Sequence, residues 1–287
     1  MTTLSICIVN WNTRDFLREC LASIDAFPPA CSAETIVVDN ASSDGSAEMV
    51  RGEFPSVRLI SNPSNVGYAK ANNQALRSAA GDWLLLLNSD VRLLPGTLNS
   101  ALETAAGLSN FGALGVRQVG SNGIVQRSVR SFPEPLGILW ELLGLSKAFP
   151  QSKTFGSYRM TWFDYSGTIE ADQPMATFLL TARDVYEEAG GLDENFPIFF
   201  NDVDWCFRIK EIGKKIYYTD RASIIHYGGA STGKAKRSAM TAESKLSLIR
   251  FYEKHYRNKL PKVVFNGVLN AVSLSLAFQR LRDLTPG

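Results

Sequence analysis

The sequence predicts an α/β fold in which a mostly parallel sheet carries helices on both faces. Short apolar runs that are typical of buried strands alternate with segments of helical periodicity, and this alternation favours parallel strands joined by helices. The chain has 287 residues, of which 45% are hydrophobic. It is therefore long enough to bury a core without disulfide or metal staples.

The first half of the chain contains the clearest elements. Apolar runs predict strands at residues 4–9, 35–38, 57–60 and 83–87. Helical spacing predicts helices at residues 16–24 and 68–80, and a further helix after Pro95 that contains Leu98 and Leu102.

The second half is less regular. Asn122-Gly123 predicts a hairpin, whereas residues 132–165 show no clear period and predict no defined element. Further on, the pattern predicts an apolar run at 176–180, a short helix closed by Gly190-Gly191, a helix that ends near Gly213, and two strands at 216–219 and 223–226.

Each of the first four predicted strands ends in short polar residues. These ends are Asn10-Trp11-Asn12, Asp39-Asn40-Ala41-Ser42, Asn65-Val66-Gly67 and Asn88-Ser89-Asp90. A single cluster of this kind is typical of an ordinary turn. Four in phase predict a polar crevice, because ligands of open α/β sheets bind outside the carboxyl ends of the strands.

The apolar run at 83–87 stops abruptly at Asn88-Ser89-Asp90, so the carboxylate of Asp90 is the first candidate for a metal or phosphate-handling group. His226, one of two histidines, ends a predicted strand before Gly228-Gly229 and supplies an imidazole that would complete a Mg²⁺ or Mn²⁺ site. A buried histidine satisfied by protein partners is an equally good interpretation of His226.

Asp202 and Asp204 open a predicted helix, where acids commonly cap free amides and complement the helix dipole. Because they are two residues apart, they do not share a helix face, and Arg208 lies four residues after Asp204. We expect Asp204 to cap or to pair with Arg208 and Asp202 to enter the crevice as a general base.

Composition excludes several classes of protein. A net charge of +2 with 20% charged residues argues against disorder and against a nucleic-acid-binding surface. The four cysteines lack metal-ligand spacing and predict reduced core residues. The N-terminus lacks the pattern of a signal peptide, so we expect a cytoplasmic protein.

Five ordered motifs carry a family resemblance. The sequence closely resembles family 2 glycosyltransferases over about residues 4–230. The motifs are Val9-Asn10-Trp11-Asn12, Asp39 through Ser46, Asn65 through Asn73, Leu87-Asn88-Ser89-Asp90, and Gly190 through Glu194 with Asn201 through Arg208.

The resemblance implies a GT-A fold, which is Rossmann-like with a smaller mixed acceptor-side region. It also implies a nucleotide-diphospho-sugar donor, a divalent metal (Mg²⁺ or Mn²⁺) and single displacement with inversion at the anomeric carbon. In this sequence one acid stands at the end of Asn88-Ser89-Asp90 where many relatives have two. Asn201 stands where an acid commonly precedes the base, which would lower the pKa of Asp202 by removing a like charge.

The resemblance also assigns roles to individual residues. It implies that Asp90 binds metal with help from His226 and that Asp202 is the general base. It also implies which residues hold the donor: Asn10 and Asn12 by the nucleotide, Asp39 at the base or ribose, and Asn65, Gly67 and Lys70 along the donor site. We add Asn88 and Ser89, which belong to the predicted crevice.

Within the family, the chain most resembles bacterial rhamnosyltransferases that extend lipid-linked cell-surface polysaccharides from dTDP-rhamnose. Another hexose donor is an alternative, as is a nucleotidyltransferase, although no Gly-rich basic phosphate loop follows the first strand. A sugar- or nucleotide-binding module without catalysis is the non-enzymatic alternative. The expected partners are the donor and a glycan or lipid-linked glycan acceptor, with no nucleic acid.

We expect a glycosyltransferase domain at residues 1–232, with a nucleotide-binding half at 1–115 and an acceptor and catalytic half at 116–232. Residues 233–287 are expected to form a basic, amphipathic helical region. From Lys234 to Lys262, nine Lys or Arg face two Glu, a net charge of +7. With the apolar row Leu269, Val272 and Leu276, this predicts peripheral contact with the cytoplasmic face of the inner membrane, or else docking on the domain or on a second subunit.

Overall fold

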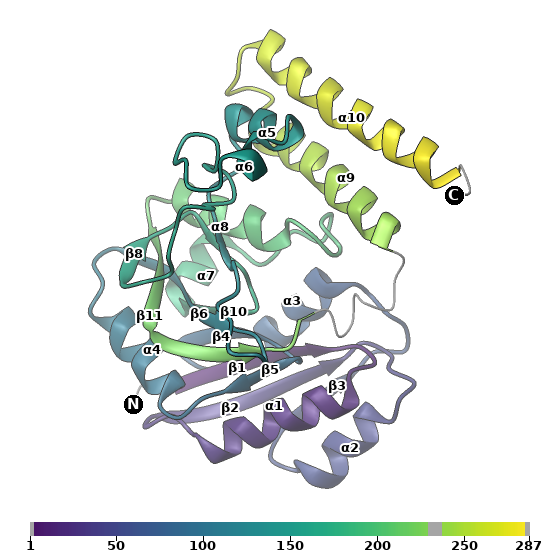
Figure 1. Ribbon diagram of the computed structural model, residues 1–287. Coiled ribbons are helices and arrows are strands. Elements are labelled where there is room, and N and C mark those ends of the chain that lie inside the picture. The colour runs from purple at the N-terminus through teal and green to yellow at the C-terminus, as the bar shows by residue number, and fades with distance from the viewer. Residues whose placement is uncertain (1–2, 229–236, 285–287) are drawn as a thin grey trace. The chain divides into compact units, whose positions relative to one another are not determined.

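A computed structural model describes residues 3–228 and 237–284 of the chain (Figure 1). Gly229, Lys234 and Lys236, which belong to predicted features, lie outside the described residues. The chain divides into two compact units. The first comprises Met1–Val129, Tyr165–Pro197 and Asn201–Ser231, and the second comprises Arg130–Asp164, Ile198–Phe200 and Thr232–Gly287.

The first unit is built on a mostly parallel sheet. Among the described residues the strand order is β3-β2-β1-β4-β10-β6-β11-β5, and β8 pairs with β11. Strands β1 to β4 run parallel, and the antiparallel β10 separates β4 from β6. The strands are β1 (Thr3–Asn10), β2 (Ser32–Asp39), β3 (Arg58–Ser61), β4 (Trp83–Asn88), β5 (Val91–Leu93), β6 (Phe111–Val119), β8 (Thr168–Glu170), β10 (Phe178–Ala182) and β11 (Lys215–His226). The predicted fold class is confirmed.

Helices cover both faces of this sheet (Figure 1). Alternate residues of β1 divide between the faces: Leu4, Ile6 and Ile8 pack in the core cluster under α1, α2 and α4. On the opposite face, α3 packs against β1 and β2. The helices are α1 (Arg14–Ala26), α2 (Ser46–Glu53), α3 (Tyr68–Ser78), α4 (Thr97–Ala106), α7 (Arg183–Ala189) and α8 (Asn201–Glu211).

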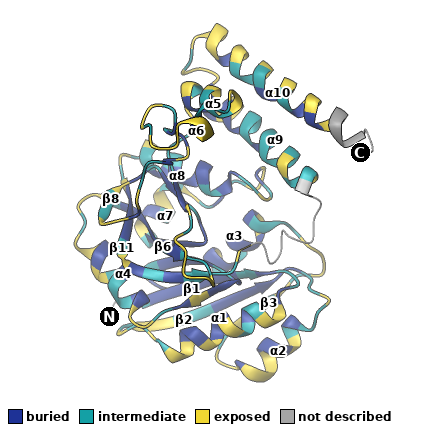
Figure 2. Ribbon diagram, viewed as in Figure 1, coloured by how far each residue is buried: buried dark blue, intermediate teal, exposed yellow. Residues whose placement is uncertain are grey.

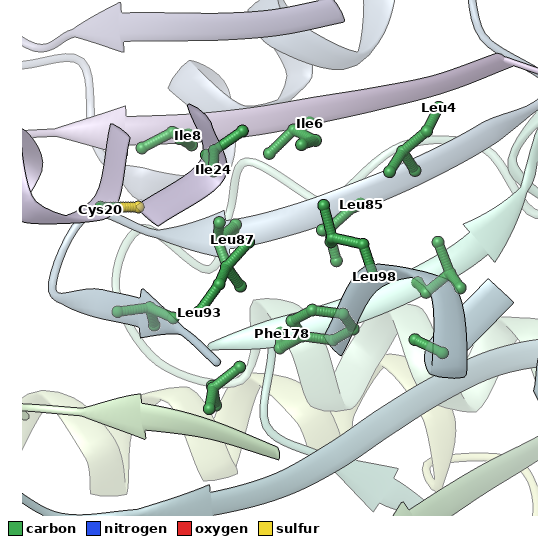
Figure 3. Packing of buried hydrophobic residues seen from close by; sticks show 14 of the residues in the cluster. Leu4, Ile6, Ile8, Cys20, Ile24, Leu85, Leu87, Leu93, Leu98 and Phe178 are labelled. Carbon is green, nitrogen blue, oxygen red and sulfur yellow. The ribbon is translucent and has the colours of Figure 1, made fainter. Parts of the chain in front are cut away.

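The core is formed by aliphatic side chains from neighbouring parallel strands, as Figure 3 shows for Leu85 and Leu87 beside Ile6 and Ile8. All four cysteines are free, as the sequence predicts. Burial raises the pKa of the Cys7 thiol to about 12, so this thiol stays protonated inside the sheet.

One element differs from the sequence prediction. The two strands expected at 216–219 and 223–226 form a single strand, β11, with an irregularity in its register against β6 between Thr219 and Ser223. The polar residues between them resemble a turn, but a bulge lets the strand continue. The turn predicted at Asn122-Gly123 is confirmed, since Val119 bridges Val125 and Gly123 has a φ of 76°.

The stretch at 132–165, which predicted no defined element, contains two short helices of the second unit. That unit comprises α5 (Pro135–Leu142), α6 (Leu145–Ala148), α9 (Arg237–His255) and α10 (Lys262–Leu284). The Tyr252 hydroxyl of α9 donates to the Pro133 carbonyl at 2.5 Å, and Tyr256 donates to Glu134 at 2.7 Å. These bonds fix α9 to the segment that precedes α5.

Helix α10 packs on α9 and α5 within the second unit. Val272 and Leu276, which the sequence assigned to a possible membrane-facing row, are buried in this packing. No described helix has the combined length and apolar character needed to cross a bilayer. The row itself therefore serves helix packing, and other side chains form the exposed apolar surface of this unit.

Candidate functional site

The ends of β1 and β2 are tied together by buried polar side chains. Asn10 lies opposite Asp39 in the parallel register, and both are buried. The Asn10 Nδ2 donates to Asp39 Oδ1 at 3.0 Å and to Ser42 Oγ at 3.1 Å, and Thr13 Oγ1 donates to Asn10 Oδ1 at 2.6 Å. Asn10 thus orients Asp39 at the carboxyl ends of β1 and β2.

Asn12 fixes the loop that follows β1. Its φ is 54°, a left-handed conformation that Asn tolerates better than most residues. Its side-chain oxygen accepts from the Ser43 amide at 2.7 Å, and its own amide donates to Ser42 Oγ at 2.9 Å. The loops after β1 and β2 therefore form one hydrogen-bonded edge.

The loop after β3 joins the same edge through Asn40. The Asn40 Nδ2 donates to Asn65 Oδ1 at 2.8 Å, and Asn40 Oδ1 accepts from the Val66 amide at 2.9 Å. Gly67 has a φ of 87°, which disfavours any side chain there. Lys70 is exposed in the first turn of α3, where its ammonium is accessible to an anion.

The end of β4 is hydrogen-bonded to the loop after β1 and to α3. Ser89 Oγ lies 2.9 Å from Thr13 Oγ1, and Asn88 Oδ1 accepts from the Tyr68 hydroxyl at 3.0 Å. Burial, followed by the nearby carboxylates of Asp202 and Asp90, raises the pKa of Tyr68 well above its ordinary value. The Tyr68 hydroxyl therefore stays protonated.

Asp90 and His226 meet because β5 and β11 pair antiparallel. This pairing places His226 opposite Val91, the residue after Asp90, and the Tyr227 amide donates to the Asp90 carbonyl at 3.0 Å. The Asp90 Oδ1 lies 3.5 Å from His226 Nε2, and both side chains are largely buried.

Asp202 and Asp204 separate as the sequence predicts for acids two residues apart. Asp204 is fully buried and pairs with Arg208 at 2.9 Å, which confirms the expected pairing. Asp202 Oδ2 instead accepts from Gln173 Nε2 at 2.9 Å and from the Ala176 amide at 3.3 Å. Ala176 also places its carbonyl 3.5 Å from the Tyr68 hydroxyl, so Ala176 links Asp202 to Tyr68.

Comparisons with known proteins identify the family of this chain. The family model described as Glycosyl transferase family 2 matches residues 5–169, more than half of the chain. The chain belongs to glycosyltransferase family 2. It is therefore an enzyme that transfers a sugar from a nucleotide-sugar donor.

This glycosyltransferase is similar to curated relatives along most of its length. It is 27% identical to N-acetylglucosaminyl-diphospho-decaprenol L-rhamnosyltransferase of Mycobacterium tuberculosis over 268 residues, which cover 88% of this chain and 85% of that protein. It is 23% identical to the low-salt glycan biosynthesis hexosyltransferase Agl10 of Haloferax volcanii, covering 78% of this chain and 66% of that protein.

Solved structures share its GT-A fold. The mannosyltransferase PcManGT from Pyrobaculum calidifontis, in complex with GDP-Man and Mn²⁺, is 17% identical with a TM-score of 0.60, covering 97% of this chain and 73% of that one. GalNAc-T7 with UDP, GalNAc and Mn²⁺ is 12% identical with a TM-score of 0.59, covering 99% of this chain and 55% of that one.

Both of these neighbours hold Mn²⁺. The described residues contain no cluster of three or more His, Cys, Asp or Glu side chains around a common point. Asp90 and His226 supply two ligand atoms 3.5 Å apart, close to the roughly 3 Å that separates adjacent ligands of one cation. The pair fits a divalent ion that takes its other ligands from the donor phosphates and water.

Three of the hydrogen-bonded polar residues, Asn40, Tyr68 and Gln173, were given no role of their own in the sequence prediction. Asn40 and Tyr68 stand inside the quoted motifs, so their positions carried a signal. Gln173 stands in no motif, and only its hydrogen bond to Asp202 in the folded chain identifies it.

Proposed function

We propose that this enzyme is an inverting, metal-dependent rhamnosyltransferase that transfers L-rhamnose from dTDP-rhamnose to a lipid-linked or cell-surface glycan. The observation that carries the proposal is the Asp90–His226 pair at the strand ends of a family 2 fold. Similarity to the mycobacterial N-acetylglucosaminyl-diphospho-decaprenol L-rhamnosyltransferase supports rhamnose and a decaprenol-linked acceptor. A different hexose on the donor is the alternative, which the Agl10 relative favours.

In this proposal the edge at the first three strands holds the nucleotide. Asp39, oriented by Asn10, contacts the base or ribose, and Asn12, Asn65 and Gly67 shape the donor loops. Lys70, Asn88 and Ser89 belong to the same donor site. A divalent cation held by Asp90 and His226 would offset the negative charge of the leaving diphosphate.

Asp202 is the proposed general base. Its Oδ2 is held by Gln173 and the Ala176 amide, and its Oδ1 accepts from the Val203 amide at 2.9 Å. The ionised carboxylate is the form that accepts the proton of the acceptor hydroxyl. As the new bond to the anomeric carbon forms on one side, the bond to the diphosphate breaks on the other, and the configuration inverts.

We further propose that the second unit rests on an anionic membrane surface, where a lipid-linked acceptor would be found. Its support is a set of exposed apolar side chains on α5 and α10, among them Leu136 (63% exposed), Val263 (85%) and Phe278 (71%). The basic residues of α9 add attraction to anionic lipids. The proposed location is the cytoplasmic face of the inner membrane.

The test of the donor and the metal is a thermal-shift series. dTDP-rhamnose, UDP-glucose and GDP-mannose, with their parent diphosphates, are each added with Mn²⁺ or with EDTA, because a ligand of the native state raises the melting temperature. We expect the largest rise with dTDP-rhamnose and Mn²⁺. Asp90→Ala should lower that rise and remove its sensitivity to EDTA, whereas Asp25→Ala, an exposed acid of α1, should not.

A larger rise with another nucleotide sugar would replace the donor assignment and leave the metal in place. Equal rises with Mn²⁺ and with EDTA in the unmutated protein would instead remove the metal from the mechanism.

A further inference from the structure

Gln126 contacts the candidate metal ligand His226 from a hairpin that is far away in the sequence. The hairpin folds back on β6, with the Gln126 amide donating to the Gln118 carbonyl at 2.8 Å. The Gln126 side chain makes two bonds to His226, one hundred residues further along the chain.

These two bonds define which way the Gln126 amide points. Its Nε2 donates to the His226 backbone carbonyl at 2.8 Å. Its Oε1 therefore faces His226 Nδ1, also at 2.8 Å. An amide oxygen only accepts, so Nδ1 must carry the proton that joins them.

The consequence lies at the other ring nitrogen. In neutral imidazole with a proton on Nδ1, Nε2 carries a lone pair, and this lone pair lies on the side of Asp90 Oδ1. The 3.5 Å between Nε2 and Oδ1 exceeds a normal hydrogen bond. Two acceptor atoms at this spacing suit a cation bound to both.

We infer that Gln126 is a positioning residue of the metal site, which selects the histidine tautomer able to bind the cation and holds the ring in place. This inference rests on the proposed role of Asp90 and His226. Partners of this kind commonly change metal affinity 10- to 100-fold when they are removed. Gln126 is assigned no contact with the nucleotide or the acceptor.

The first test reads the tautomer directly. The chain has only two histidines, so ¹⁵N NMR of the imidazoles gives two sets of signals, and a His255→Gln variant assigns them. At about pH 8.5, above the ordinary histidine pKa of about 6.5, we expect His226 to be protonated on Nδ1. Gln126→Met should shift it toward the Nε2-protonated form, while His255 stays unchanged as an internal control.

The second test measures Mn²⁺ affinity by electron paramagnetic resonance, with dTDP and with UDP in parallel. Gln126→Met should weaken Mn²⁺ binding about 10- to 100-fold. Gln126→Glu, which keeps an acceptor for Nδ1 but loses the donor to the His226 carbonyl, should weaken Mn²⁺ binding less than Gln126→Met. Ile124→Met, an exposed position in the same hairpin, is the matched control and should leave the affinity unchanged.

The outcomes separate the inference from the proposed function. If His226→Ala weakens Mn²⁺ binding but Gln126→Met does not, the role of Gln126 is wrong and the metal site stands. If His226→Ala itself leaves Mn²⁺ binding unchanged, the metal assignment and the inference are both wrong. A wild-type His226 protonated on Nε2 at pH 8.5 would also overturn the inference.

Discussion

The two units treat large apolar side chains differently. The first unit buries them in a sheet core, and among the described residues only Ile124 and Val125 are exposed there. The other ten exposed large apolar side chains all belong to the second unit, and Figure 2 shows exposed positions along α10. These ten are Leu136, Leu139, Leu142, Leu143, Phe149, Ile198, Val263, Val264, Leu274 and Phe278.

This difference indicates a division of roles. In the first unit, buried amides, hydroxyls and acids at one sheet edge are joined by hydrogen bonds. The second unit exposes apolar surface of a kind that marks interaction sites on proteins. Variants in the first unit should therefore change donor binding or chemistry, and variants in the second should change attachment.

The largest effect is expected from Asp202→Asn in the first unit. Loss of a general base typically costs about 10²- to 10⁴-fold in rate, so we expect kcat to fall about 10³-fold. The amide keeps the size of the carboxylate, so donor affinity measured by calorimetry should stay within about threefold, as expected for a group that acts only in the chemical step.

Asp25→Asn, at an exposed position of α1, is the control for that measurement and should keep full turnover. Normal turnover of Asp202→Asn would refute its role as the base. Weak donor binding by the same variant would instead place Asp202 in the donor site.

The next largest effect is expected on the stability of the first unit, at Asp204. Asp204→Ala leaves Arg208 partly buried without its carboxylate, and breaking a buried pair costs about 3–5 kcal/mol of unfolding free energy. Urea denaturation followed by tryptophan fluorescence measures it. The exposed pair of Arg18 and Glu53 gives the control, and Glu53→Ala should shift the midpoint much less because solvent screens that pair.

If the midpoints of Asp204→Ala and Glu53→Ala moved equally, burial would not distinguish the two pairs.

How much of this site the sequence predicts depends on how local its parts are. The strand ends at Asn10, Asp39 and Asp90 follow from apolar runs and the residues that end them, so they were found without a structure. The meeting of Asp90 with His226 depends on β5–β11 pairing, which no local pattern encodes. The residue types at the two strand ends suggested that pair, and the family resemblance implied it as well.

Other features depend on the folded chain alone. Gln126 and Gln173 stand in no motif, and their partners lie 100 and 29 residues away. The continuity of β11 depends on a bulge against β6, and the polar residues at this bulge resemble a turn in the sequence. The helices within 132–165 lack an amphipathic period because several of their apolar residues are exposed.

A smaller effect is expected at the exposed apolar surface of the second unit. Leu136→Ser with Leu143→Ser removes two exposed leucines from the α5 segment, and we expect binding to vesicles containing phosphatidylglycerol to fall roughly 10- to 100-fold. Flotation of the protein with vesicles measures it. Donor affinity should not change.

The matched control lies in the first unit, where Ile124→Ser with Val125→Ser removes its two exposed apolar side chains. If this pair reduced vesicle binding as much as the leucine pair, the contrast between the units would be wrong. If the unmutated protein bound neutral phosphatidylcholine vesicles equally well, the basic residues would have no role in membrane binding.

The smallest effect is expected at Asp44, which ties the loop after β2 to the first turn of α1. Its carboxylate accepts from the Arg14 amide at 2.8 Å and from Ser46 Oγ at 2.5 Å. Burial acts to raise the pKa of Asp44, but these hydrogen bonds to Ser46 and Arg14 outweigh it and the net pKa is lowered. Loss of such a cap in Asp44→Ala should cost about 1 kcal/mol of unfolding free energy at pH 7.

The sign of the pH dependence follows from the lowered pKa. The ionised carboxylate stabilises the folded protein at pH values above the ordinary aspartate pKa of about 3.9, and this contribution is lost as the pH falls through the lower folded-state pKa. The difference in unfolding free energy between wild type and Asp44→Ala should therefore be full at pH 7 and shrink below about pH 4. Urea titrations at both pH values measure it, and a difference that is the same at pH 7 and pH 3 would show that packing of the side chain, and not its charge, holds the loop.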